Sequence, residues 1–243
     1  MKIIGAVQLK ILKVYNFNKK TLDNFGKFEY SITYQMSEIK HDILYTIGHS
    51  NHTIKHFIAL LKRYEIGTVV DVRSVPYSRY CSQFNKDILS ADLEAVNIQY
   101  AFLGKELGAR PDDSTCYEGG CANFEWMAER REFKDGIHRI LTNIGKRYIA
   151  LMCSEKEPLE CHRTILVCRN LKKYNLCIKH ILEDGETEDH CDTERRLVKM
   201  LKIEPTLFEP KTESDLIEQA YNQQSQNISY KSEETDKIHE WAK

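Results

Sequence analysis

From residue 42 onward, short apolar runs alternate with stretches in which apolar residues recur every three or four positions. A short run rich in β-branched side chains predicts a buried strand, whereas the three-to-four spacing predicts a helix. The pattern predicts strands at 43–47, 68–72, 98–102, 148–152 and 177–182. It predicts helices between and after them at 54–64, 84–93, 133–144, 162–173 and 193–202.

This alternation is typical of an α/β fold, with a mostly parallel sheet between two layers of helices. We expect one core domain at 42–205, an N-terminal extension at 1–41 and a polar C-terminal tail at 206–243. The tail after residue 210 is rich in Gln, Ser, Glu, Asn and Lys, which predicts a loosely attached or disordered segment. We therefore expect 1–35 and 211–243 to be dispensable for folding.

Composition narrows the classes of function. The 35 Lys and Arg residues against 36 Asp and Glu leave a formal charge of −1, which excludes a globally basic nucleic-acid binder but not a local basic patch. No apolar run reaches the roughly 20 residues of a membrane span, so we expect a cytoplasmic protein with no membrane partner. The eight cysteines include no Cys-x-x-Cys pair, and a disulfide framework is not expected.

Polar loops follow three of the predicted strands. Ligands of open parallel sheets bind at the carboxyl ends of the strands, so these loops are expected to share one edge. The candidate site residues in them are His49, Ser50, Asp71, Arg73, Tyr77, Ser78, Arg79, Cys153, Cys161 and Arg163. So many charged and nucleophilic groups on one edge indicate an anionic ligand.

Several segments carry a family resemblance. They are Tyr45-Thr-Ile-Gly-His-Ser50, Asp71-Val-Arg73 with Pro76 and Ser78-Arg79, Leu103-Gly104, Met152-Cys-Ser-Glu-Lys-Glu-Pro-Leu-Glu-Cys-His-Arg163, and His180-Ile181 followed by Asp184-Gly185 and His190. In this order they resemble the domain-of-unknown-function family 488 over roughly residues 42–190. The resemblance implies a compact α/β domain. It implies no reaction, because the family is named for lacking one.

Cys161 is the best candidate for a reactive thiol. It stands at the start of the predicted helix 162–173, where free N–H groups and the helix dipole favour a thiolate, and Arg163 is close by. Successive helix residues point about 100° apart, so His49 is favoured over His162 as the general base or acid. Cys153 continues an apolar strand and is expected to be half-buried, with a raised thiol pKa.

These residues predict a cysteine-dependent hydrolase or transferase that acts on a phosphate-bearing substrate, either a nucleotide or a nucleic acid. Arg73 and Arg163 would bind phosphate or carboxylate, Cys161, His49 and Cys153 would supply the chemistry, and no cofactor is expected. Tyr77 and Tyr80 flank Arg79, a combination that suits base stacking beside a phosphate contact.

Other interpretations remain open. The chain could be a non-catalytic nucleic-acid or nucleotide-binding module with structural cysteines, or a redox sensor that uses Cys153 and Cys161 as a reversible pair. A metal site of Cys153, Cys161, His162 and His49 ranks low, because the step between the two cysteines is longer than the usual chelating spacing.

The cysteine segment does not have the spacing of a tyrosine-phosphatase loop. A tyrosine-phosphatase loop would require Arg where this sequence has Leu159, counted from Cys153, or Val167, counted from Cys161. That mechanism is therefore not supported, and rhodanese-type sulfur transfer is no more than an analogy.

Overall fold

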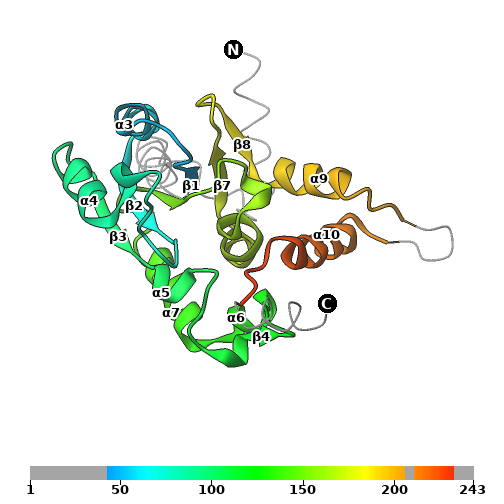
Figure 1. The fold of residues 1–243 in the computed structure, drawn as a ribbon. Helices are drawn as coiled ribbons and strands as arrows, with labels where there is room; N and C mark the ends of the chain where they lie inside the picture. Colours follow the sequence, from blue (N-terminus) through cyan, green and yellow to red (C-terminus); the bar gives the residue numbers. More distant parts are fainter. Residues whose placement is uncertain (1–42, 206–210, 233–243) are drawn as a thin grey trace, which may run out of the picture. The chain divides into compact units, whose positions relative to one another are not determined.

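A mostly parallel six-stranded sheet forms the centre of the computed structural model (Figure 1). The structure describes residues 43–205 and 211–232. The predicted N-terminal extension lies outside these residues, as do 206–210 and 233–243. The strand order is β3-β2-β6-β1-β7-β8, and β8 alone is antiparallel to its neighbour. The strands are β1 (Ile43–Gly48), β2 (Ile66–Asp71), β3 (Gln99–Phe102), β6 (Tyr148–Cys153), β7 (Cys177–Ile181) and β8 (Thr187–Asp189).

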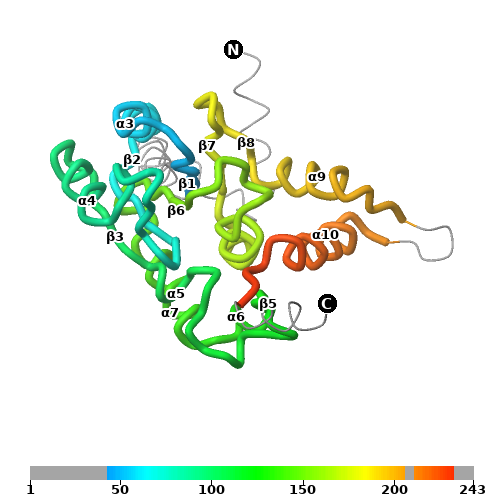
Figure 2. The backbone as a smooth tube through the Cα atoms, in the orientation of Figure 1, coloured from blue at the N-terminus to red at the C-terminus, as the bar shows by residue number. Residues whose placement is uncertain are grey.

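Helices cover both faces of this sheet, which confirms the predicted α/β fold. One face packs against α3 (Ile54–Arg63) and α4 (Lys86–Glu94). The other face packs against α7 (Arg131–Leu141), a π-helix (Arg163–Cys168), α9 (His190–Met200) and α10 (Glu213–Ile228). Shorter elements are α5 (Gly104–Leu107), α6 (Phe124–Glu129), α8 (Arg169–Leu171) and a hairpin of β4 (Tyr117–Glu118) and β5 (Cys121–Ala122). The tube in Figure 2 follows the same path. None of the helices in the described residues is long and apolar enough to span a bilayer.

The strand side chains alternate between the two apolar layers. In β6, Ala150 and Met152 face the α3–α4 layer, whereas Leu151 and Cys153 face the layer of α7 and the π-helix. This two-residue period decides which chemistry lies on which face of the sheet. The thiol of Cys153 is therefore on the same side of the sheet as the helix that follows Cys161.

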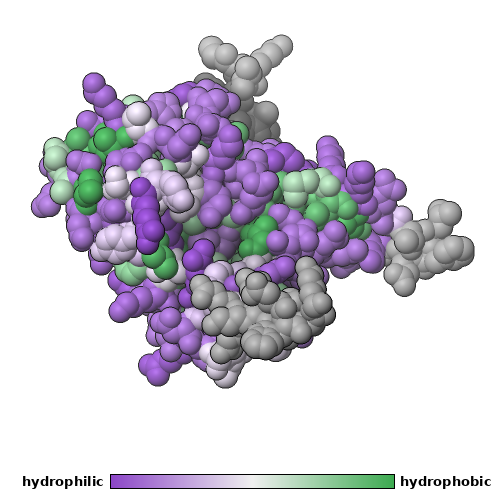
Figure 3. Space-filling model, viewed as in Figure 1, coloured by the Kyte–Doolittle hydropathy of each residue, from purple (hydrophilic) through white to green (hydrophobic). Residues whose placement is uncertain are grey.

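The C-terminal tail differs from its prediction. Residues 213–228 form α10, which begins at a capping box between Thr212 and Asp215. Ala220 and Tyr221 are buried in the core, and Gln224 donates from its side chain to the carbonyl of Leu159 at 2.8 Å. Polar composition suggested a loose tail, but the few apolar residues recur on one helical face and pack on the domain. Figure 3 shows apolar residues between α9 and α10 on an otherwise largely hydrophilic face.

Because α10 is part of the core, its buried residues should contribute to stability. Tyr221→Ala removes a buried aromatic ring and should lower the free energy of unfolding by about 3 kcal/mol or more. Gln223→Ala on the exposed face of the same helix should change it by less than about 0.5 kcal/mol. Urea denaturation of the full chain measures both. Equal, small effects for the two variants would mean that α10 is loosely attached.

Candidate active site

The ends of β1, β2 and β6 meet at one edge of the sheet. The backbone N–H of His49 donates to the carbonyl of Cys153 at 2.9 Å, and that of Val72 donates to Met152 at 3.1 Å. β6 lies between β1 and β2 and pairs with both in parallel, so the expected adjacency of the three strands is confirmed. A Cβ atom on Gly48 would lie 2.0 Å from the carbonyl oxygen of Glu155, so the loop after β6 folds directly over the end of β1.

Four side chains of this loop form a cluster, which we call the thiol cluster. They are Cys153, Glu155, Cys161 and His162, and their sulfur, oxygen and nitrogen atoms all lie within 4.8 Å of one another. Cys153 is 2% exposed and Cys161 is 1% exposed. The carboxylate oxygen Oε2 of Glu155, a residue at the surface, lies 3.0 Å from the Cys161 sulfur. The cluster is thus buried at the sulfurs and reaches solvent through Glu155.

His162 belongs to this cluster, contrary to the sequence argument that set it aside. Its Nδ1 atom lies 3.6 Å from the Cys153 sulfur, and its Nε2–H donates to the carbonyl of Val72 at 2.9 Å. Helical spacing would apply only if residues 161 and 162 were successive helix positions. Cys161 has an extended backbone instead, with φ −130° and ψ 135°, and the π-helix begins at Arg163. The angle between neighbouring helical side chains therefore does not apply.

Both ring nitrogens of His49 are engaged by groups outside the thiol cluster. Its Nδ1–H donates to the carbonyl of Ser50 at 2.8 Å, and its Nε2 accepts from Arg73 Nη1 at 3.0 Å. The ring stacks on Phe84 with 4.3 Å between centroids. Burial lowers the pKa of His49 to about 4, so the imidazole is neutral at ordinary pH. With both nitrogens engaged, His49 supports Arg73.

Arg73 also has its partners inside the protein. Its Nη2 and Nε atoms donate to the two carboxylate oxygens of Asp71 at 2.7 and 3.0 Å, and Nη2 donates to the carbonyl of Phe84 at 2.8 Å. Tyr100 donates from its hydroxyl to the same carboxylate at 2.7 Å. Such a bidentate pair is strong and geometrically defined. Within the described residues, the Asp71 carboxylate is therefore the anion that Arg73 binds.

Arg163 holds the loop between the two cysteines. It is 0% exposed, and its Nη1 and Nη2 atoms donate to the carbonyls of Glu155 at 2.5 Å and Lys156 at 3.2 Å. Its Nε–H donates to the hydroxyl of Thr46 at 3.4 Å, and its backbone N–H points to the Cys161 sulfur at 3.4 Å. A buried positive charge and a helical N–H thus both lie beside Cys161.

The pKa values of the two thiols are shifted in opposite directions. Burial alone would raise the pKa of Cys161, but a hydrogen bond from Cys153 and the positive charges of Arg163 and His162 outweigh it and hold the pKa well below the usual value. Burial and the adjacent Cys161 sulfur raise the pKa of Cys153 well above normal. Burial also raises the pKa of Glu155, reinforced by the charge of Cys161. These contacts shift Cys161 toward its thiolate form, and they shift Cys153 and Glu155 toward their protonated forms.

A chain of buried hydrogen bonds continues from Arg163 across the sheet. Thr46 in β1 accepts from Arg163, and its oxygen lies 2.8 Å from Nδ1 of His180 in β7. The Nε2 atom of His180 lies 2.9 Å from Nδ1 of His190 at the start of α9. Thr46 and His180 are cross-strand partners on the same face, so the parallel register of β1 and β7 brings them together.

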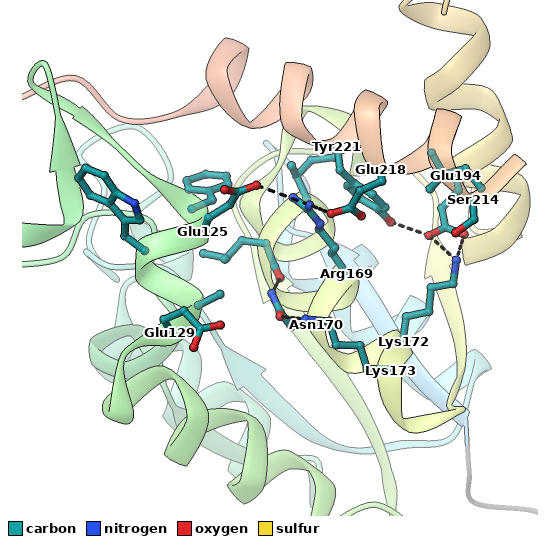
Figure 4. Close-up of a pocket in the computed structure, with 16 residues that line it drawn as sticks. Glu125, Glu129, Arg169, Asn170, Lys172, Lys173, Glu194, Ser214, Glu218 and Tyr221 are labelled. Carbon is teal, nitrogen blue, oxygen red and sulfur yellow. Dashed lines mark hydrogen bonds and ion pairs between the residues drawn. The ribbon is translucent and has the colours of Figure 1, made fainter. Parts of the chain in front are cut away.

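The chain ends at an acid beside a pocket. The Tyr221 hydroxyl lies 3.1 Å from Nε2 of His190 and donates to Glu194 at 2.9 Å, and Glu194 pairs with Lys172 at 2.6 Å. Figure 4 shows Tyr221, Glu194 and Lys172 at the edge of a pocket, and the volume of this pocket is about 650 Å³. Tyr221 has one proton and gives it to Glu194, so it must accept from His190.

The hydrogen bond from His190 to Tyr221 also determines the tautomers of His190 and His180. His190 donates from Nε2 to Tyr221 and accepts at Nδ1 from His180, which in turn accepts at its own Nδ1 from Thr46. Each imidazole then carries one proton and is neutral. Burial lowers the pKa of His190 to about 4 and that of His180 well below normal, in agreement with this assignment. The chain thus connects Arg163 to Glu194, and each hydroxyl and imidazole proton along it is donated to the next member.

The remaining predicted residues lie on an exposed turn after β2. Tyr80 is 97% exposed, and Tyr77 is exposed with its hydroxyl donating to Asp87 at 3.3 Å. The Ser78 hydroxyl accepts from the backbone N–H groups of Tyr80 and Cys81 at 3.2 Å and shapes the turn. Arg79 is exposed and makes no ion pair or hydrogen bond with another described residue. Ser50, in the first loop, has a φ of 44° and a hydroxyl that donates to Asn51 at 3.3 Å.

Sequence reasoning missed several of these participants. Glu155 was visible within the cysteine segment, between the two thiols. Thr46 and His180 were visible as polar residues inside otherwise apolar strands, at positions that face the π-helix layer. Tyr221 had no signal beyond helical spacing in a polar tail.

Comparison with known proteins places part of this region in a family. Residues 53–169 match the family model described as Domain of unknown function DUF488. No curated protein and no solved structure matches the chain. The matched segment contains Arg73, the thiol cluster and Arg163, whereas His49, His180 and Tyr221 lie outside it.

The hydrogen-bond chain through Thr46 generates a stability prediction. Thr46→Val keeps the shape but leaves the Nε–H of Arg163 and Nδ1 of His180 without this partner, at a cost of about 1–3 kcal/mol in the free energy of unfolding. Thr68→Val is the matched control, because its hydroxyl bonds to the exposed side chain of Gln99. It should change stability by less than about 0.5 kcal/mol. If urea denaturation finds Thr46→Val as stable as Thr68→Val, the chain does not hold Arg163.

Proposed function

Residues 53–169 belong to the DUF488 family, whose name states no reaction, and from the site we propose that this protein is a cysteine-dependent hydrolase or transferase. Cys161 is the nucleophile, and the substrate bears phosphate, as a nucleotide or a nucleic acid. His162, Glu155 and Cys153 are the groups that exchange protons around the sulfur.

The observation that carries this proposal is the set of groups around the Cys161 sulfur. The backbone N–H of Arg163 lies at 3.4 Å and the Glu155 carboxyl at 3.0 Å, and the charges of Arg163 and His162 lower the thiol pKa. A cysteine that fills space in a core needs none of these partners. Cys168, on the same π-helix and equally buried, has a thiol whose pKa is raised by burial.

The reaction conserves atoms and protons as follows. The Cys161 sulfur uses a lone pair to form a bond to the electrophilic atom of the substrate, and the bond to the leaving group breaks. The leaving group takes that electron pair and a proton from the His162 imidazolium. Water or a second substrate then takes the group from the sulfur and returns its proton to His162, which restores the thiolate.

Recognition of the substrate is assigned to the exposed turn. The donors of Arg73 and Arg163 are occupied by partners inside the protein, so Arg79 is the cation that is open to a phosphate. Tyr77 and Tyr80 on either side of it offer ring faces to a base. Aromatic stacking beside a cation is how single-stranded nucleic acids and nucleotides are bound without base-specific contacts.

A second candidate is a non-catalytic module that binds nucleic acid or a nucleotide. It is favoured by the burial of both thiols, at 1–2% exposure, and by the closed pair of Arg73 and Asp71. In this case the turn binds the ligand, and the thiol cluster stabilises the fold.

Thiol alkylation separates the two candidates. At about pH 6 ordinary thiols with a pKa near 8.5 are almost wholly protonated, so iodoacetamide should modify Cys161 before the exposed Cys177 and Cys191. Peptide mapping by mass spectrometry gives the order, and Cys168 is the control for a buried thiol whose pKa is raised by burial. Modification of Cys161 no faster than that of Cys168 would favour the binding module.

The exposed turn has its own test. Tyr80→Ala should weaken binding of a short single-stranded oligonucleotide by roughly tenfold, because one stacking partner is lost. Arg79→Gln should also weaken it, because the phosphate contact is lost. Arg131→Gln changes an exposed arginine outside the turn, at the start of α7, and should leave the affinity unchanged. Fluorescence anisotropy measures all three variants. Unchanged affinity in the turn variants would remove the turn from substrate recognition.

A further inference from the structure

We infer that the thiol cluster is also a binding site for one thiophilic divalent cation, for which Zn²⁺ is the probe. Its ligands are the sulfurs of Cys153 and Cys161, Nδ1 of His162 and a carboxylate oxygen of Glu155. The inference rests on the positions of these four atoms and does not require the proposed reaction.

The four donor atoms lie near the separations of a tetrahedral site, with the Cys161 sulfur and the Glu155 oxygen somewhat closer together than a bound ion requires. With zinc–sulfur bonds near 2.3 Å and zinc–nitrogen bonds near 2.0 Å, neighbouring ligand atoms are about 3.5–3.8 Å apart. The Cys153 sulfur and Nδ1 of His162 are 3.6 Å apart, and the Cys161 sulfur and the Glu155 oxygen are 3.0 Å apart. All four lie within 4.8 Å of one another, so small side-chain rotations suffice to surround one ion.

The imidazole of His162 is oriented as in a metal site. Its Nε2–H donates to the carbonyl of Val72 at 2.9 Å, which points Nδ1 at the sulfurs. Metal-bound histidines typically donate their other N–H to a carbonyl or carboxylate, because that bond fixes the tautomer and the ring orientation. His49, which the sequence argument counted as a ligand, has both nitrogens engaged elsewhere and is not part of the site.

The charges also balance. Two thiolates and one carboxylate bring three negative charges, and a divalent cation leaves one of them uncompensated. The Arg163 guanidinium, whose charge acts on both cysteines, supplies the remaining positive charge in a region that is almost closed to water. Thiolate and imidazole ligands together favour zinc over magnesium or calcium.

The long step between the cysteines does not prevent this arrangement. A 3-10 turn at Pro158–Glu160 and the bonds of Arg163 to the carbonyls of Glu155 and Lys156 fold the loop back on itself. In a short chelating pair the backbone itself brings two ligands together. Here a buried arginine brings them together.

Metal binding and nucleophilic attack use the same lone pairs of Cys161. A bound ion therefore protects Cys161 from alkylation, and its removal by a chelator restores the thiolate. The two states exclude each other, so the ion keeps the thiol in a resting form.

The test uses the full chain after removal of metal with a chelator. Zn²⁺ titrated in competition with a chromophoric chelator should bind at one ion per chain, and it should slow alkylation of Cys161. Glu155→Gln changes a surface residue and is expected to leave the fold intact; it should weaken binding by roughly tenfold or more. Cys161→Ser should weaken it further, and Cys168→Ser and Cys177→Ser, outside the cluster, should not.

Two results would overturn the inference. One is binding of less than one Zn²⁺ per chain by the unmodified protein, and the other is equal affinity in the Glu155→Gln, Cys161→Ser and Cys177→Ser variants. Alkylation of the metal-free protein is measured separately, so rapid modification of Cys161 without zinc binding removes the metal site and leaves the proposed reaction standing. Zinc binding by a protein whose metal-free Cys161 is not alkylated supports the metal site and removes the proposed reaction.

Discussion

The burial of the Arg163 guanidinium is the constraint on which the site depends. A charged group with no exposure to water is tolerated where its donors are satisfied and its charge is compensated. Two loop carbonyls and the Thr46 hydroxyl accept its hydrogen bonds, and the nearby Cys161 sulfur is the natural carrier of the compensating charge. The fold of the loop, the bond to Thr46 at the start of the polar chain and the lowered pKa of Cys161 are all tied to this buried charge.

The two buried arginines at this edge of the sheet stabilise different loops. Arg73 is closed by Asp71, His49 and Phe84, and it ties the loops after β1 and β2 to each other. Arg163 ties the loop after β6 to the centre of the sheet. Both guanidinium groups are buried and donate to partners inside the protein, so under the proposed function the exposed turn that contains Arg79 contacts the substrate.

The hydrogen-bond chain links this frame to the C-terminal helix. Tyr221 of α10 accepts from His190, and that bond sets the tautomers of both histidines as far as Thr46. The helix therefore completes a network that begins beside Cys161, although the two are far apart in sequence. Each neutral histidine accepts a hydrogen bond at Nδ1 and donates one from Nε2. Loss of either histidine therefore leaves one buried donor and one buried acceptor without a partner.

The sequence by itself determined the α/β fold, the positions of most strands and helices, and the meeting of the loops after β1, β2 and β6 at one edge of the sheet. These follow from local patterns: apolar periodicity, β-branched runs and polar loops after strands. Tertiary structure alone decided that His162 rather than His49 meets the thiols, because an extended Cys161 precedes the π-helix. It also decided that both arginines pair internally and that α10 joins the core. Such outcomes depend on which distant groups share a buried space, since burial makes every donor and charge find a partner, and no local pattern records that.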